Sequence, residues 1–177
     1  MLVGFKAQNH PQQVAKDDVD DRAVPDGEFW AINRRFNFTV DSAASVKNAR
    51  LPRFWTKETN GLEQPWAGER IWCNPPFSSL RPWVEKAWRE DRAQIIVMLI
   101  PANRTEQTFW QDLIEPRRDR EGSPLRVEFL PNRLRFYRPG AAVVPANSRP
   151  PFGCCLLIWN WANAASETRR TGLPPSP

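Results

Sequence analysis

Residues 95–100 read Ile-Ile-Val-Met-Leu-Ile and end at Pro101. The run is continuous and mostly branched, without the polar alternation of a half-exposed strand. Such a run is typical of a strand that is buried on both sides in a parallel sheet. The preceding residues 80–88 carry apolar side chains on one face of a predicted helix. A helix followed by a buried strand indicates an α/β layered fold with a mostly parallel central sheet.

Further helices and strands are predicted on both sides of this run. Phe29, Ile32 and Phe36 recur at helical spacing after Pro25, which predicts a helix of about three turns. Ser78-Ser79 is predicted to cap the helix over residues 80–88. The other predicted elements are a strand at 38–40 that ends at Asp41, a strand at 71–73, a helix at 109–114, a charged loop at 115–122, and strands at 127–130, 134–137 and 154–159.

The length of 177 residues and the apolar content of 41% favour a single globular domain. Residues 1–21 end in an acidic run and show no lasting periodicity, so a flexible arm is expected there. The Pro-rich tail at 164–177 is expected to be disordered. The folded domain is therefore predicted over residues 22–163.

Composition excludes several classes of protein. The net charge of +5 and the isoelectric point near 9.6 fit a polyanionic partner. Three cysteines, two of them adjacent, suggest no disulfide framework and favour a reduced, cytoplasmic protein. No apolar run is long enough to cross a membrane. The single histidine, His10, argues against both a metal site and a Ser/His/Asp site.

The string Asn74-Pro75-Pro76-Phe77 follows the predicted strand at 71–73. An amino group on a heterocyclic base is a poor nucleophile, because its lone pair is delocalised into the ring. The side-chain oxygen of Asn74 and the carbonyl of Pro75 could each accept one N–H, and Pro76 has no N–H to occupy a neighbouring acceptor. Phe77 offers a face on which a base can stack. The alternative interpretation is a turn after a strand.

Asp41, Asn74 and Pro101 each follow or end a predicted strand, where ligands bind in α/β folds. An Asp followed by small residues is suited to an adenosyl cofactor, because the carboxylate binds hydroxyl or amino hydrogens and the small side chains let the backbone approach. Taken alone, Asp41 could equally cap a helix. The chain has no Gly-x-Gly phosphate loop, which favours a cofactor without phosphates, such as S-adenosylmethionine.

The order of these motifs resembles the phage-type DNA N6-adenine methyltransferase (Dam-like) family over about residues 20–160. The resemblance is carried by Phe38–Ser45, Asn48-Ala49, Asn60–Leu62, Trp66, Trp72–Phe77, Trp83–Ala87, Ile100–Ala102 and Arg133–Phe136.

The resemblance implies an abbreviated Rossmann-like fold with helices on both faces of the sheet, and transfer of a methyl group from S-adenosylmethionine to adenine N6 in DNA. It implies that the target base is flipped out of the duplex, that Asn74, Pro75 and Pro76 orient its amino group, and that Phe77 stacks on it. The implied cofactor contacts are Arg22, Pro25, Asp41, Ser42, Ala43, Ala44, Asn60, Gly61 and Leu62.

Arg104, Arg133 and Arg135 are predicted to contact DNA phosphates, although each could be an ordinary surface arginine. The short distance between the cofactor and catalytic strings leaves no room for a separate recognition domain. Short or relaxed sequence specificity is therefore expected, read by the loops 115–125 or 138–152. A monomer in the cytoplasm of a phage-infected or prophage-carrying bacterium is expected. The rival hypotheses are a cytosine-N4 methyltransferase and a catalytically idle DNA-binding or decoy protein.

Overall fold

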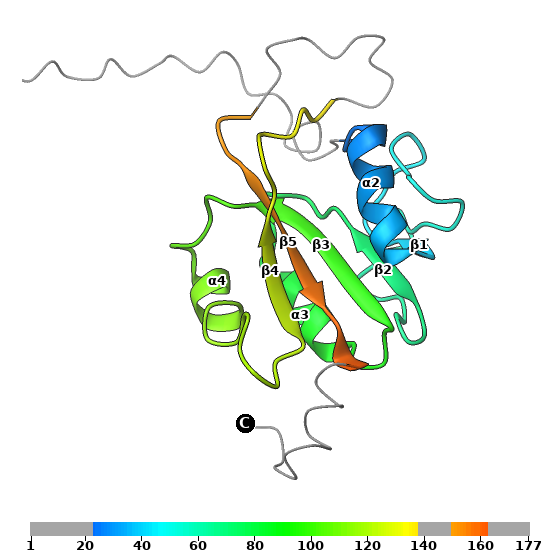
Figure 1. Cartoon of the computed structure of the whole chain (residues 1–177). Coiled ribbons are helices and arrows are strands. Elements are labelled where there is room, and N and C mark those ends of the chain that lie inside the picture. The colour runs from blue at the N-terminus through cyan, green and yellow to red at the C-terminus, as the bar shows by residue number, and fades with distance from the viewer. Residues whose placement is uncertain (1–22, 138–149, 163–177) are drawn as a thin grey trace, which may run out of the picture.

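The computed structural model describes residues 23–137 and 150–162 (Figure 1). The predicted arm at 1–21, the tail at 164–177 and the predicted cofactor residue Arg22 lie outside this part of the chain. The described strands are β1 (Val40–Asp41), β2 (Arg70–Cys73), β3 (Ile95–Pro101), β4 (Leu125–Phe129) and β5 (Cys154–Trp159), and the described helices are α2 (Asp26–Phe36), α3 (Arg81–Arg89) and α4 (Thr108–Leu113).

The strands form one mixed sheet in the order β1-β2-β3-β5-β4, which can be followed across Figure 1. The pairs β1·β2 and β2·β3 are parallel, whereas β5 is antiparallel to both β3 and β4. Four strands therefore run in one direction, and β5 alone runs against them. The α/β class is confirmed. The expected parallel sheet around residues 95–100 is found for β1, β2 and β3, whereas β5 pairs with β3 in the antiparallel direction.

The central strand β3 is buried along its whole length, as its sequence predicts. Its residues alternate between two apolar clusters, because successive side chains of a strand point to opposite faces. Met98 shares a cluster with Val84 of α3 and Phe109 of α4. Val97 shares the other cluster with Phe29 of α2. The two clusters together form the core.

Helix α2 has the start and end that its sequence suggests. It follows Pro25, and Phe29, Ile32 and Phe36 are its buried residues, which confirms the predicted face. Asn37 ends the helix in the left-handed conformation, with φ of 50°, and its N–H donates to the carbonyl of Asn33. This turn sends the chain directly into β1.

Two predicted local features are wrong. Ser78 and Ser79 do not cap α3, because Leu80 is the residue at its start and no side chain caps it. A proline in the first turn of the helix favours the start there instead. Within the described residues, 134–137 join no strand of the sheet, because Tyr137 pairs instead with Ala23 in an isolated bridge.

The sheet is abbreviated at the β1 edge. β1 pairs directly with β2, and the described residues between them include no helix and no named strand. Only the bridge from Asp41 to Phe54 extends the pairing outward. The long connection at residues 42–69 is therefore available to build loops at the strand ends. Among the described residues, no helix has the length and apolar content needed to span a bilayer.

Candidate active site

The ends of neighbouring parallel strands meet at one edge of the sheet, as the sequence predicts. Asp41 ends β1, Asn74 directly follows β2, and Pro101 ends β3. A cavity of about 840 Å³ lies at this edge, over the ends of β1 and β2. Small-molecule and cofactor sites typically have volumes of roughly 300–1,000 Å³. The cavity is therefore large enough for a nucleoside-sized ligand.

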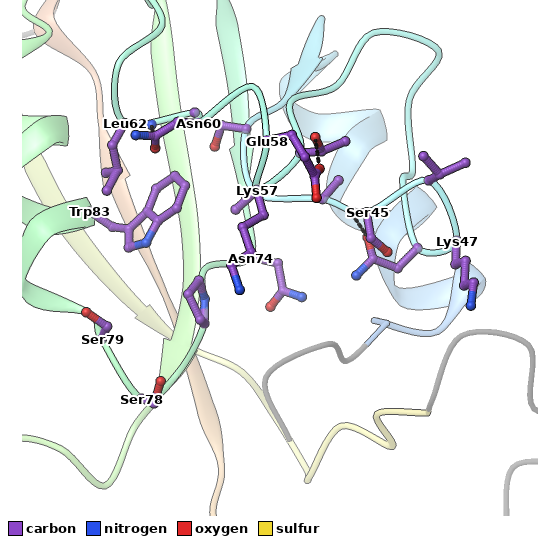
Figure 2. A pocket seen from close by; sticks show the side chains of 18 residues that line it. Ser45, Lys47, Lys57, Glu58, Asn60, Leu62, Asn74, Ser78, Ser79 and Trp83 are labelled. Atoms are coloured by element: carbon purple, nitrogen blue, oxygen red, sulfur yellow. Dashed lines mark hydrogen bonds between the residues drawn. The ribbon is translucent and has the colours of Figure 1, made fainter. Parts of the chain in front are cut away.

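Three segments line the cavity (Figure 2): the loop 42–48 after β1, the loop 56–62, and the turn that follows β2. In Figure 2, Leu62 and Trp83 lie at one end of the opening and Ser45 and Lys47 at the other, with Asn74 between them. The predicted residues that line it are Ser42, Ala43, Ala44, Asn60, Gly61, Leu62, Asn74 and Pro76. Lining residues that sequence reasoning missed include Lys47, Lys57, Glu58, Ser78, Ser79 and Trp83, whose only signal is their closeness to predicted residues.

The loop 42–48 forms the first wall of the cavity. It is attached to the sheet through Ser42. Its N–H and its hydroxyl both donate to the carbonyl of Trp72, at 2.8 and 3.1 Å. The N–H of Ala44 donates to the carbonyl of Trp55 at 2.9 Å. Because Ser42, Ala43 and Ala44 are small, the backbone itself forms much of this wall.

The loop 56–62 forms the second wall of the cavity and contacts the first wall at Gly61. A Cβ atom at Gly61 would lie 2.0 Å from the carbonyl oxygen of Ser42 and 3.3 Å from the Trp83 ring. The indole N–H of Trp66 donates to the Gly61 carbonyl at 3.0 Å, which holds the loop in this position. Only glycine allows so close an approach between the two walls.

Asp41 lies beneath the first wall and does not line the cavity. Its side chain is only 3% exposed, and its Oδ2 accepts the N–H of Arg50 at 3.0 Å. Its Oδ1 has no hydrogen-bond partner among the residues that the structure describes. Burial raises the pKa of this carboxyl group from 3.8 to about 6, although the amides of Arg50 and Ala43 act in the opposite direction.

Asp41 is expected to make the protein less stable as pH rises from about 4 to 6. The folded state holds the proton more tightly than the unfolded state, so ionisation in this window favours unfolding by up to roughly 3 kcal/mol. The free energy of unfolding, measured by urea titration at several pH values, should show this fall in the natural chain and not in Asp41→Asn. Equal pH dependence of the two proteins between pH 4 and 7 would contradict the burial argument.

Arg50 joins the first wall to two distant segments. Its guanidinium group donates to the Asp26 carboxylate, the Val24 carbonyl and the Tyr137 hydroxyl, and lies 5.5 Å from the centre of the Tyr137 ring. The side chain is only 14% exposed. Predicted cofactor residue Pro25 does not line the cavity, but Arg50 contacts the residues on either side of it. No sequence signal distinguishes Arg50 from other arginines.

Arg50→Ala is expected to lower the free energy of unfolding by about 2–3 kcal/mol, because it leaves three oxygen acceptors without their shared donor. Arg53→Ala is the matched control, since the Arg53 side chain is 58% exposed in its ion pair with Glu69. The control should cost less than about 1 kcal/mol. Equal losses in the two variants, measured by urea denaturation, would show that the Arg50 contacts add nothing special.

The turn after β2 presents one unused backbone acceptor. Asn74 is half-buried and lines the cavity together with Pro76. The carbonyl of Pro76 accepts the N–H of Ser79 at 3.1 Å. The carbonyl of Pro75, by contrast, accepts no hydrogen bond from any residue within the described ranges. The Pro75 carbonyl is therefore not used by the described backbone, and Pro75 itself is buried beside Asn74 and does not line the cavity.

Phe77 lies next to this turn but does not line the cavity. Its ring packs nearly perpendicular to Phe136 and Phe152, with centroid distances of 5.6 and 6.3 Å. The three rings form the aromatic cluster Phe77–Phe136–Phe152. This cluster holds Phe77 in one place and connects the turn to the segments after β4 and before β5.

The site contains no sign of thiol or metal chemistry. Cys73 is fully buried beside Asn74, and burial strongly raises the pKa of its thiol, so the reactive thiolate does not form at neutral pH. Within residues 23–137 and 150–162, no group of three or more His, Cys, Asp or Glu side chains could hold a metal ion.

The three predicted DNA contacts do not line the cavity. Arg104 follows β3, and Arg133 and Arg135 follow β4, which runs in the same direction as β3. All three are therefore placed at the same edge as the cavity, over the other half of the sheet. The Nε atom of Arg104 is buried and has no partner in the described part of the chain.

The sequence of the chain matches a known protein family. The sequence profile of the family described as DNA N-6-adenine-methyltransferase (Dam) matches residues 12–131, more than half of the chain. The chain belongs to this family. The family resemblance of the motifs is thereby confirmed, and the matched range includes the turn at Asn74 and both cavity walls.

Two phage relatives have the same description. The chain is 33% identical over 102 residues to the DNA N-6-adenine-methyltransferase of Haemophilus phage HP1. The aligned region covers 55% of this chain and 58% of that protein. It is 34% identical over 74 residues to the DNA N-6-adenine-methyltransferase of Escherichia phage T1, which covers 41% of this chain and 31% of that protein. The chain thus matches about half or less of the length of these curated relatives.

Proposed function

We propose that this chain transfers a methyl group from S-adenosylmethionine to the N6 amino group of adenine in DNA. The observation that carries the proposal is the cavity that Asn74 and Pro76 share with the small-residue walls at 42–44 and 60–62. The family membership and the names of both phage relatives support the same reaction.

The residues present fit S-adenosylmethionine. The close approach of Gly61 to Ser42 makes a backbone-lined cradle that a Cβ atom would fill. Ser42, Ala43 and Ala44 on one side and Asn60, Gly61 and Leu62 on the other would hold the cofactor by backbone contact and packing. When bound, the cofactor supplies an electrophilic methyl group. Asp41 supports the first wall from below through the Arg50 amide.

The turn after β2 would orient and activate the target amino group. The side-chain oxygen of Asn74 accepts one N–H and the Pro75 carbonyl accepts the other, which draws the nitrogen lone pair out of the ring and directs it toward the cavity. Most of the rate enhancement then comes from positioning, since an amino group held in this way needs no strong general base.

The target adenine would leave the duplex to reach this turn, at a cost of a few kcal/mol. Stacking on an aromatic ring typically contributes about 1–3 kcal/mol and offsets part of that cost. The contacts with Phe136 and Phe152 fix the Phe77 ring before the base arrives, so little ordering is needed on binding. Arg104, Arg133 and Arg135 would hold the DNA over the ends of β3 and β4.

The proposed fold is an abbreviated Rossmann-like methyltransferase domain over residues 22–163, with helices on both faces of the sheet. The division of the core into one cluster with α2 and another with α3 and α4 supports this assignment. Residues 42–69 between β1 and β2 build the two cavity walls, which leaves no space for a separate recognition domain there. Short or relaxed sequence specificity follows from that lack of space.

The test is to incubate the protein with phage-length DNA and methyl-labelled S-adenosylmethionine, then digest the DNA and identify the labelled nucleoside. Label in N6-methyladenine supports the proposal. Label in N4-methylcytosine selects the rival amino-methyltransferase, which needs the same two acceptors. Absence of label, with DNA still bound, selects a catalytically idle DNA-binding protein.

A further inference from the structure

We propose that the segment Leu130–Tyr137 sets the recognition sequence, with Arg135, assisted by Arg133, reading base pairs that flank the target adenine. This inference rests on the proposed function, because it names the residues that would select the DNA site. It follows from the direction of β4, the packing of Phe136 and two arginines that no acidic side chain of the described residues binds.

The direction of β4 places the segment Leu130–Tyr137 at the edge of the sheet where Asn74 lies, and places the loop 115–125 at the opposite edge. β4 runs parallel in direction to β1, β2 and β3, so the segment that follows it begins at the edge where Asn74 lies. In Figure 1 that edge is at the top, where the yellow segment after β4 meets the orange start of β5. The predicted recognition loop 115–125 precedes β4 and lies at the opposite edge, away from Asn74. Residues 138–149 of the other predicted loop lie outside the described residues.

Packing connects the segment to the catalytic turn. Leu134 and Phe136 are 7% and 6% exposed, whereas Arg133 and Arg135, which alternate with them, are exposed. This alternation is that of an extended chain with one face against the core. The Phe136 ring lies 5.6 Å from the Phe77 ring, and Arg135 is its immediate neighbour in the chain. The proposal therefore places Arg135 beside the base pairs that flank a base held at Phe77, since successive pairs are about 3.4 Å apart.

The two arginines of the segment have no acidic partner among the described residues. Neither Arg133 nor Arg135 makes an ion pair or side-chain hydrogen bond with any residue in the described ranges. The acidic residue nearest in the chain, Glu128, is already bound by Arg35 through two hydrogen bonds of 2.6 and 2.7 Å. A guanidinium group is the side chain best suited to bind both acceptors of a guanine edge. The exposed pair is therefore available for base reading.

The experiment compares Arg135→Ala, Arg135→Lys and Arg133→Ala with Arg126→Ala. Arg126 is an exposed arginine of β4 that lies toward the opposite edge, so it controls for the loss of one positive charge. For each variant, DNA affinity, binding of S-adenosylhomocysteine and the sequences around methylated adenines are measured. The cofactor product reports on folding and on the cavity without requiring DNA.

Arg135→Ala should relax the preference at one or two flanking positions by about 5- to 100-fold, with S-adenosylhomocysteine binding unchanged. Arg135→Lys should lose the same discrimination while keeping most of the DNA affinity, because lysine keeps the charge and loses the planar fork. Arg133→Ala should weaken DNA binding more than Arg126→Ala does.

Two results would overturn the inference while leaving the proposed function intact. One is a natural chain that methylates adenine without regard to flanking bases. The other is an Arg135→Lys variant with the natural site preference. If no base is methylated at all, the proposed function fails instead. In that case, the inference is tested by the difference in binding affinity between DNA sequences. A smaller difference for Arg135→Lys than for the natural chain would still support base reading, and an equal difference would overturn it.

Discussion

Asn74→Ala is expected to lower the rate of methyl transfer by about 100- to 1,000-fold, the range seen when one positioned hydrogen-bonding group is removed from an active site. The variant loses the side-chain oxygen that would accept one amino hydrogen and keeps the Pro75 carbonyl. Asn74 belongs to the turn after β2 and not to the loops 42–48 and 56–62, so S-adenosylhomocysteine should bind within about threefold of its natural affinity. A single-turnover assay with saturating DNA measures the chemical step.

Asn103→Ala is the control for this substitution. Asn103 is an exposed asparagine shortly after the end of β3, and it does not line the cavity. Its loss should leave the transfer rate unchanged. If Asn74→Ala transfers methyl groups at a rate within about fivefold of the natural chain, the proposed activation of the amino group is wrong.

Gly61→Ala is expected to reduce the affinity for S-adenosylhomocysteine by more than tenfold and to destabilise the fold. The added methyl group would lie 2.0 Å from the Ser42 carbonyl oxygen, a backbone atom that cannot move independently of the first wall. Overpacking of this kind typically costs about 1–3 kcal/mol. Isothermal titration calorimetry measures the binding loss, and urea denaturation measures the change in stability.

Gly153→Ala and Gly27→Ala are the matched controls. A Cβ atom at either glycine would meet no atom within 4 Å. Gly27 lies within α2, so alanine there should raise stability by roughly 0.5–1 kcal/mol. Natural affinity for S-adenosylhomocysteine in Gly61→Ala would mean that the walls of the cavity do not hold the cofactor.

Local sequence patterns predict a helix or strand correctly where its own residues determine its structure. The run at 95–100 is buried at every position of β3, and the helical spacing of Phe29, Ile32 and Phe36 corresponds to the buried face of α2. The alignment of Asp41, Asn74 and Pro101 at one edge also follows from the sequence, since parallel strands end together.

Features that depend on distant contacts could not be read in the same way. Nothing in residues 154–159 indicates that β5 inserts antiparallel between β3 and β4. The approach of Gly61 to Ser42 depends on the fold of the whole connection between β1 and β2. The three acceptors of Arg50 come from segments 24 to 87 residues away in the chain.

Asp41 precedes a loop that the sequence predicts as part of the site and that lines the cavity, but its own side chain has a different position from the one predicted. Its place at a strand end followed by small residues suggests direct cofactor contact. In the structure its carboxylate is buried under the first wall and bound to the Arg50 amide. A pattern of residue types can indicate which loop forms a site, but it does not determine which side chains of that loop face the ligand.

A crystal structure of the protein with S-adenosylhomocysteine would test the central claim most directly. The proposal predicts that the ligand occupies the cavity between the loops 42–48 and 56–62, with its sulfur atom facing Asn74 and the Pro75 carbonyl. A ligand bound elsewhere, or bound in the cavity with its sulfur directed away from Asn74, would contradict the proposed site.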